Sequence, residues 1–64
     1  MFVIAYNDAW EDGVLRPCYW TCRFNETDNY SVDIEDATVF KSRSAGMAMI
    51  QTLGTEHYLV EVCT

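Results

Sequence analysis

Hydrophobic and polar positions along the chain predict extended segments first, one helix late and one strand last. Phe2–Tyr6 is a continuous apolar run of strand length, and Tyr30–Val32 returns to extended structure after a polar turn. Between them, β-branched and aromatic residues predict a strand over about Cys18–Phe24. His57–Cys63 is the last predicted strand. We expect the second and third segments to form a hairpin across Asn25–Asn29.

Turn residues and a proline set the predicted strand boundaries. Asn7-Asp8 and Asp12-Gly13 each have turn chemistry, so the first strand should end at Tyr6. The loop between the two turns holds Trp10, which we expect to fold back onto the core. Pro17 lacks a backbone donor, so the next strand is either at an edge or begins after it, and we favour a start at Cys18.

The predicted helix runs over Arg43–Leu53, with Ser42 as its N-cap and Gly54 as its stop signal. One helical face should pack on the sheet, and Met47 and Ile50 should be more lateral. The residues of the packing face are spaced i, i+3, i+4, i+7 and i+8: Ala45, Ala48, Met49, Thr52 and Leu53.

At 64 residues the chain is long enough for one domain, spanning residues 1–64, with one small core. Hydrophobic residues make up 50% and aromatic residues 14%, which is too much for a disordered segment. The pattern predicts an α+β fold: a small antiparallel sheet of three to four strands with one helix packed on one face.

The chain is acidic, with ten acidic and four basic residues and a formal net charge of −6. Residues 25–36 contain five acids and no base. Such a surface repels nucleic acid and anionic membranes and attracts a basic partner. The simpler alternative is a solvated loop that keeps a small protein soluble.

Targeting signals and membrane spans are not predicted. The apolar run after Met1 is too short for a signal-peptide core and has no basic residues before it. No run approaches the ~20 apolar residues of a spanning helix. We therefore expect a complete chain in the cytoplasm, with its three cysteines reduced. Cys18 and Cys22 are ~13 Å apart along a strand, beyond the ~7 Å limit for a disulfide.

Candidate enzymatic chemistry is weak. Zinc would need Cys18, Cys22, His57 and Cys63, but the cysteine spacing lies along a strand and not on a tight turn. His57 and Cys63 are ~20 Å apart on one predicted strand, and the pairing of His57 with Cys18 or Cys22 stays open until the fold is known. A histidine at a strand start is usually a surface residue. We expect no cofactor, no metal site and no enzyme activity.

The aromatic residues outnumber what one small core easily hides. Exposed tyrosine and tryptophan residues are common anchors for protein partners, although they also complete cores. Stacking on single-stranded nucleic acid would need more basic residues than the chain has. The predicted partner-binding residues are these aromatics and the acids of the following rim: Trp10, Tyr19, Tyr30, Glu26, Asp28, Asp33, Glu35 and Asp36.

A structural motif resembles short accessory proteins encoded by bacteriophages. Asp33-x-x-x-Ala37-x-x-Phe40-x-Ser42 leads into the helix, after aromatic Tyr19-Trp20 and before a Val-rich final strand. The resemblance implies a compact module of strand–strand–helix–strand type, with Ala37 and Phe40 beneath the helix. It also implies interaction with a host protein, including inhibition of host enzymes or defence systems.

Two classes of function therefore remain. The first is a binding protein that occludes a host protein, with a sharper version in which carboxylates mimic nucleic-acid phosphates. The second is a structural or self-assembling module, such as a homodimer joined through an edge strand.

Overall fold

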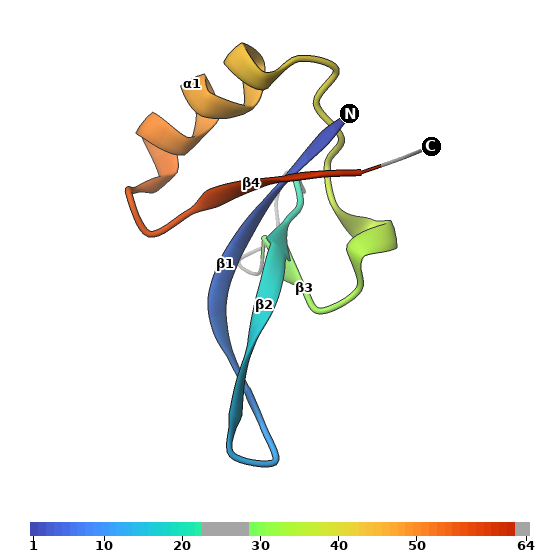
Figure 1. Ribbon diagram of the computed structural model, residues 1–64, viewed down its shortest axis with the longest axis vertical. Helices are drawn as coiled ribbons and strands as arrows, with labels where there is room; N and C mark the ends of the chain where they lie inside the picture. The colour runs from blue at the N-terminus through green and yellow to red at the C-terminus, as the bar shows by residue number, and fades with distance from the viewer. Residues whose placement is uncertain (23–28, 63–64) are drawn as a thin grey trace.

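The computed structural model describes residues 1–22 and 29–62. Its elements follow the chain in this order: β1 (Phe2–Glu11), β2 (Val14–Trp20), β3 (Tyr30–Ser31), the 3₁₀ helix η1 (Ile34–Asp36), α1 (Arg43–Leu53) and β4 (Tyr58–Glu61). The sheet has four strands in the order β3-β2-β1-β4, and every neighbouring pair is antiparallel. With α1 packed against this sheet, the predicted α+β class is confirmed (Figure 1).

The first two strands form a long hairpin, so the predicted end of the first strand at Tyr6 is wrong. β1 continues through Asn7-Asp8 to Glu11, and a register shift between Asn7 and Ala9 accommodates one extra residue. The hairpin turn is Asp12-Gly13, where φ is +51° and +78°. Positive φ at both central residues marks the type I′ turn, which matches the twist of the flanking strands.

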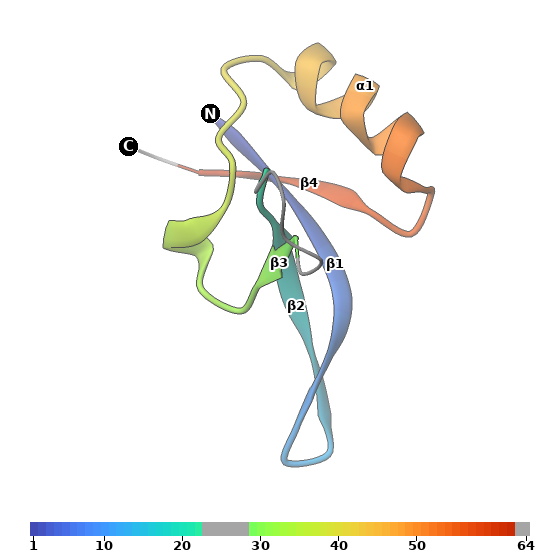
Figure 2. The ribbon, with the colours of Figure 1, turned by 180° about the vertical axis from the view of Figure 1, so that it is seen from behind.

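The hairpin projects beyond the rest of the sheet. β4 pairs with β1 only as far as Ala5, and β3 pairs with β2 only at Tyr19 and Trp20. Within the described chain, residues 7–17 therefore form a two-stranded arm, the hairpin arm. Figures 1 and 2 show it extending away from α1 on the opposite end of the molecule.

Pro17 lies inside β2, so the predicted start at Cys18 is wrong. The N–H of Thr21 donates to the carbonyl of Asn29 at 2.7 Å. In an antiparallel strand, every second residue points its backbone N–H and C=O toward the same neighbouring strand. The backbone groups of Tyr19 and of residue 17 therefore face the β3 side, as those of Thr21 do. β3 ends before reaching Pro17, so the missing N–H costs no ladder bond.

β2 ends at Trp20, whereas the predicted strand continued to Phe24. Thr21 and Cys22 are outside the strand, so the prediction is wrong for these two residues, and Phe24 lies outside the described residues. The segment before α1 forms hydrogen bonds with the end of β2 and the two residues after it. Thr38 donates its N–H to the Trp20 carbonyl at 3.0 Å, and its Oγ1 accepts from the Cys22 N–H at 2.8 Å. Phe40 exchanges two backbone hydrogen bonds with Phe2. The predicted turn at Asn25–Asn29 lies mostly outside the described residues.

The core lies between the sheet and α1. Ile4, Trp20 and Ile50 form its centre, and partly buried residues pack around them: Tyr30, Phe40, Met49, Leu53 and Leu59. The helix bounds are confirmed, and the Ser42 Oγ accepts from the Ala45 N–H at 3.2 Å.

The predicted packing face of α1 is confirmed for Met49 and Leu53, which pack against the core, and is wrong for Ala45, Ala48 and Thr52, which are exposed. Gly46 and Ile50 are buried instead, so the expectation that Ile50 is lateral is also wrong. Gly46 explains the difference, since a Cβ there would lie 2.5 Å from Leu59 Cδ2. The glycine lets the helix approach β4, and its position is not visible in a hydrophobic pattern because glycine contributes no apolar side chain.

Gly46→Val should lower the free energy of unfolding by about 1–3 kcal/mol, because the added methyl groups overpack the contact with Leu59. Ala45→Val is the matched control on the exposed neighbouring position, where only helix propensity changes, by about 0.5 kcal/mol. Urea denaturation of both variants measures the difference, and equal destabilisation would contradict the close approach.

Candidate protein-binding surface

The face of the sheet opposite the packed core carries two tyrosines, Tyr19 and Tyr58. Alternation along the strands places Val3 and Ala5 on the face opposite Ile4 and Leu59. Ala5 lies in register with Tyr19 on β2 and Tyr58 on β4, and its side chain is fully buried. The Tyr58 hydroxyl donates to Asn7 Oδ1 at 2.7 Å. Two tyrosines thus flank the small central residue of this face.

The hairpin arm carries the most exposed large hydrophobic side chain of the described chain. Trp10 is 71% exposed and lies opposite Leu15, which is 44% exposed. Val14, next to the turn, is 54% exposed. The expectation that Trp10 folds back onto the core is wrong, because the type I′ turn at Asp12-Gly13 holds it in the ladder, beyond the reach of the helix.

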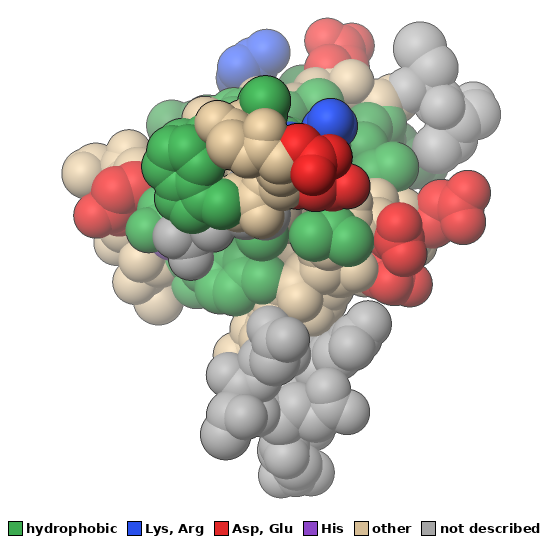
Figure 3. Space-filling model, turned by 90° about the horizontal axis from the view of Figure 1, so that it is seen from below, with side chains coloured by type: hydrophobic (Ala, Val, Ile, Leu, Met, Phe, Trp, Pro, Cys, Tyr) green, Lys and Arg blue, Asp and Glu red, His purple; other side chains and the backbone are tan. Residues whose placement is uncertain are grey.

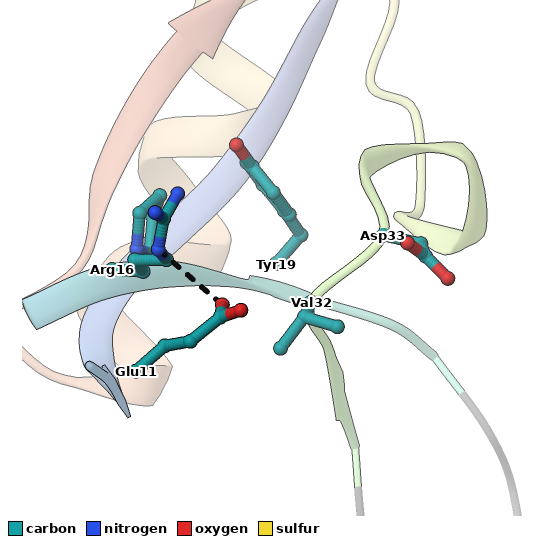
Figure 4. Close-up of a pocket in the computed structure, with 6 residues that line it drawn as sticks. Glu11, Arg16, Tyr19, Val32 and Asp33 are labelled. Atoms are coloured by element: carbon teal, nitrogen blue, oxygen red, sulfur yellow. Dashed lines mark ion pairs between the residues drawn. The ribbon is translucent and has the colours of Figure 1, made fainter.

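A groove of about 320 Å³ lies along β2, where β3 ends and the chain turns toward η1. Its lining residues come from the arm and from the segment after β3: Glu11, Arg16, Pro17, Tyr19, Val32 and Asp33. Figure 4 shows Glu11 and Arg16 at one end, Tyr19 and Val32 on either side of the middle, and Asp33 at the other end.

Charge is distributed unevenly around this surface. Arg16 Nε lies 3.3 Å from Glu11 Oε2, and both side chains are more than half exposed. Of the other basic residues in the described chain, Arg43 lies 5.1 Å from the Phe2 ring centroid at the start of α1, and Lys41 is nearby in sequence. Figure 3, seen from the arm end, shows hydrophobic side chains at the front with acidic side chains beside them. The surface is therefore apolar with a mainly acidic margin.

The structure brings some of the predicted site residues together. Trp10 is on the arm, and Tyr19 and Asp33 both line the groove. Glu35 and Asp36 are exposed on η1, where Asp36 Oδ2 accepts from the Ser31 hydroxyl at 2.9 Å. Glu26 and Asp28 lie outside the described residues.

Tyr30 lies apart from this surface. It is half-buried, packs against the core and has its hydroxyl 2.7 Å from His57 Nε2. We therefore leave Tyr30 out of the candidate surface.

Three exposed hydrophobic residues of the surface were not in the prediction: Val14, Leu15 and Val32. Asp12-Gly13 was the available signal, because an Asp-Gly pair between two extended segments is typical of a tight hairpin. It would have paired Trp10 with Leu15 and placed both beyond the core.

His57 is buried, with 9% of its surface exposed, so the expectation of a surface histidine is wrong. Its Nδ1 lies 3.1 Å from the Gly54 carbonyl oxygen, which only accepts. In the neutral ring, Nδ1 therefore carries the proton and the Tyr30 hydroxyl donates to Nε2. Tyr6 stacks on the imidazole, with the ring centroids 4.9 Å apart. Both nitrogens thus have structural partners in the folded chain.

Tyr30→Phe should remove part of the loss of stability at alkaline pH. Burial, followed by the charges of Tyr6, Glu56 and Cys18, raises the pKa of Tyr30 above its ordinary value of 10.0. The unfolded chain therefore ionises first, and the free energy of unfolding falls as pH rises from about 10 through the raised pKa. The variant should show a shallower fall, and about 1 kcal/mol lower stability at neutral pH from the lost hydrogen bond.

Urea denaturation between about pH 9 and 11 measures this slope. Tyr58→Phe, which removes an exposed hydroxyl from Asn7, is the control and should keep the wild-type slope. The same slope in Tyr30→Phe and wild type would contradict the assignment.

Cys18 and Cys22 are the two described cysteines of the zinc hypothesis. Cys18 and Cys22 form no disulfide, in line with the expectation for these two residues. Within residues 1–22 and 29–62, no group of three or more His, Cys, Asp or Glu side chains is placed to hold a metal ion. Cys63, part of the zinc hypothesis, lies outside those ranges.

Comparison with protein-family models, curated proteins and solved structures found no significant match for this chain. In the described part of the chain, α1 is too short and too polar to cross a membrane.

Proposed function

We propose that this chain is a small, non-enzymatic binding protein of the bacteriophage type, which inhibits or modulates a host protein in the host cytoplasm. It acts by steric occlusion, with the hairpin arm covering or entering a functional surface of its partner. The exposure of Trp10 is the observation that carries the proposal. A 64-residue domain has little apolar surface to spare, yet this indole lies in water beside Leu15. Exposed patches of this kind are common at protein interfaces.

The arm suits insertion better than strand pairing. Both of its edges carry features that hinder the addition of another strand. Pro17 removes a donor from the β2 edge, and the register shift between Asn7 and Ala9 distorts the β1 edge. These features favour binding through side chains and disfavour the alternative of a module that self-assembles through its edge strands.

The acidic margin supports a partner with a basic surface. Charge complementarity of this kind increases the rate of encounter and weakens as salt rises. The apolar contact of Trp10 and Leu15 should depend much less on salt.

Capture from a nuclease-treated bacterial lysate tests the proposal. The tagged protein is used as bait at low and at high salt, and bound proteins are identified by mass spectrometry. We expect one dominant partner at low salt. Its retention at high salt would assign most of the affinity to the arm, and its loss would assign it to charge, including mimicry of nucleic acid. The absence of a partner at both salt concentrations would overturn the proposal in favour of self-assembly.

A further inference from the structure

The groove along β2 is lined by hydrogen-bond acceptors, and at Pro17 its backbone edge has no N–H donor. The backbone of Pro17 turns toward the β3 side, as the alternation from Thr21 and Tyr19 requires. β3 ends at Ser31 and does not reach this position. The β3-side edge of β2 therefore presents the carbonyl oxygen of Pro17 as an acceptor, and Pro17 has no N–H to donate. Such an edge suits a ligand that only donates.

Carboxylates stand at both ends of the same groove. Figure 4 shows the Glu11 carboxylate pointing toward the middle from one end, and Asp33 at the other end with its exposed side chain pointing outward. The ion pair of Glu11 with Arg16 is a single contact between side chains that are 67% and 58% exposed. Pairs this exposed contribute little to stability, so an incoming cation can compete with Arg16 for Glu11.

The middle of the groove is apolar. Val32 is 68% exposed and Tyr19 is half-buried, and both line the groove together with Pro17. Figure 4 shows the side chains of Tyr19 and Val32 pointing in opposite directions from neighbouring backbone positions. An aliphatic stem can pack on Val32 and Pro17, and a flat cation can stack on the phenol ring. Arginine combines both features with five donors and no acceptor.

We propose that this groove binds an arginine side chain of the partner protein. The inference rests on the proposed function and adds the chemistry of the contact to it. A second copy of this chain does not fit, because two molecules with a net charge of −6 repel each other. Of the two arginines within residues 1–22 and 29–62, Arg16 already lines the groove and Arg43 lies over Phe2.

The test is a titration of the ¹⁵N-labelled protein with a blocked pentapeptide, acetyl-Gly-Gly-Arg-Gly-Gly-amide, followed by NMR. We expect saturable shifts at Tyr19, Val32 and Asp33, with a Kd on the order of millimolar for one side chain. The same peptide with glutamine in place of arginine should leave these signals unchanged. Equal shifts with both peptides, or shifts spread evenly over all acidic residues, would overturn the proposal.

Matched variants locate the contact. Asp33→Asn and Glu11→Gln should each weaken binding about two- to fivefold, the range for exposed ion pairs. Glu61→Gln changes an exposed acid on β4, outside the groove lining, and should change the Kd by less than about 1.5-fold. An equal loss in all three variants would indicate general attraction to an acidic protein and would contradict a specific groove.

The peptide titration separates this inference from the proposed function. It needs no cellular partner, so it can fail while lysate capture succeeds through the arm. If capture fails while the arginine peptide saturates the groove, the binding chemistry stands and the host-protein function does not.

Discussion

Ile4→Ala should lower the free energy of unfolding by about 2–5 kcal/mol, the usual cost of removing a fully buried isoleucine side chain. Ile4 has no exposed surface and packs with Trp20 and Ile50 at the centre of the core. A domain of this size has about 3–10 kcal/mol of stability in total. A large share of the variant should therefore be unfolded at 25 °C. Urea denaturation followed by circular dichroism measures the loss.

Val39→Ala is the control for Ile4→Ala, because Val39 is 48% exposed. We expect it to change the free energy of unfolding by less than about 0.5 kcal/mol. If Ile4→Ala were as stable as this control, the core described between α1 and the sheet would be wrong.

Trp10→Ala should have the opposite profile, with a large effect on binding and almost none on folding. The side chain is 71% exposed, so its removal should change the free energy of unfolding by less than about 0.5 kcal/mol. Tryptophan anchors at interfaces commonly contribute 2 kcal/mol or more. The Kd for the captured partner should therefore rise by about thirtyfold or more. Isothermal titration calorimetry with the purified partner measures this change.

Met47→Ala removes a large side chain that is 44% exposed on the helix, away from the hairpin arm. Its Kd should match that of the wild-type protein. A tight complex with Trp10→Ala, or an equal loss in both variants, would contradict the role of the arm.

The local signals of the helix and the order of the elements were sufficient to predict the fold class. The Ser42 cap and Gly54 bounded the helix correctly, because capping depends on residues next to one another in sequence. The antiparallel pairing of β2 with β3 was also predicted and is confirmed.

Features that depend on tertiary context were predicted less well. Pro17 is tolerated because β3 is short, and the length of β3 cannot be seen in the residues around Pro17. The orientation of α1 depends on the approach of Gly46 to Leu59, two residues far apart in sequence. His57 is buried because Tyr6, Tyr30 and the Gly54 carbonyl surround it.

The candidate surface was predicted in part. Trp10, Tyr19 and Asp33 were named from residue type and charge, and all three lie on the arm or in the groove. Tyr30 has the same residue type as Tyr19 but packs against the core. Tyr30 lies in register with Trp20, and the side chains of Trp20 and its neighbour Tyr19 point to opposite faces of the sheet. Residue type alone does not separate an exposed anchor from a core aromatic.

Site-specific photo-crosslinking in bacterial lysate tests the central claim most directly. The photoreactive residue p-benzoylphenylalanine replaces either Leu15 on the arm or Met47 on the helix, two positions that are both 44% exposed. We predict one discrete adduct with a host protein from position 15 and none from position 47. Adducts of equal yield from both positions, or an adduct of only twice the mass of the chain, would contradict binding of a host protein through the arm.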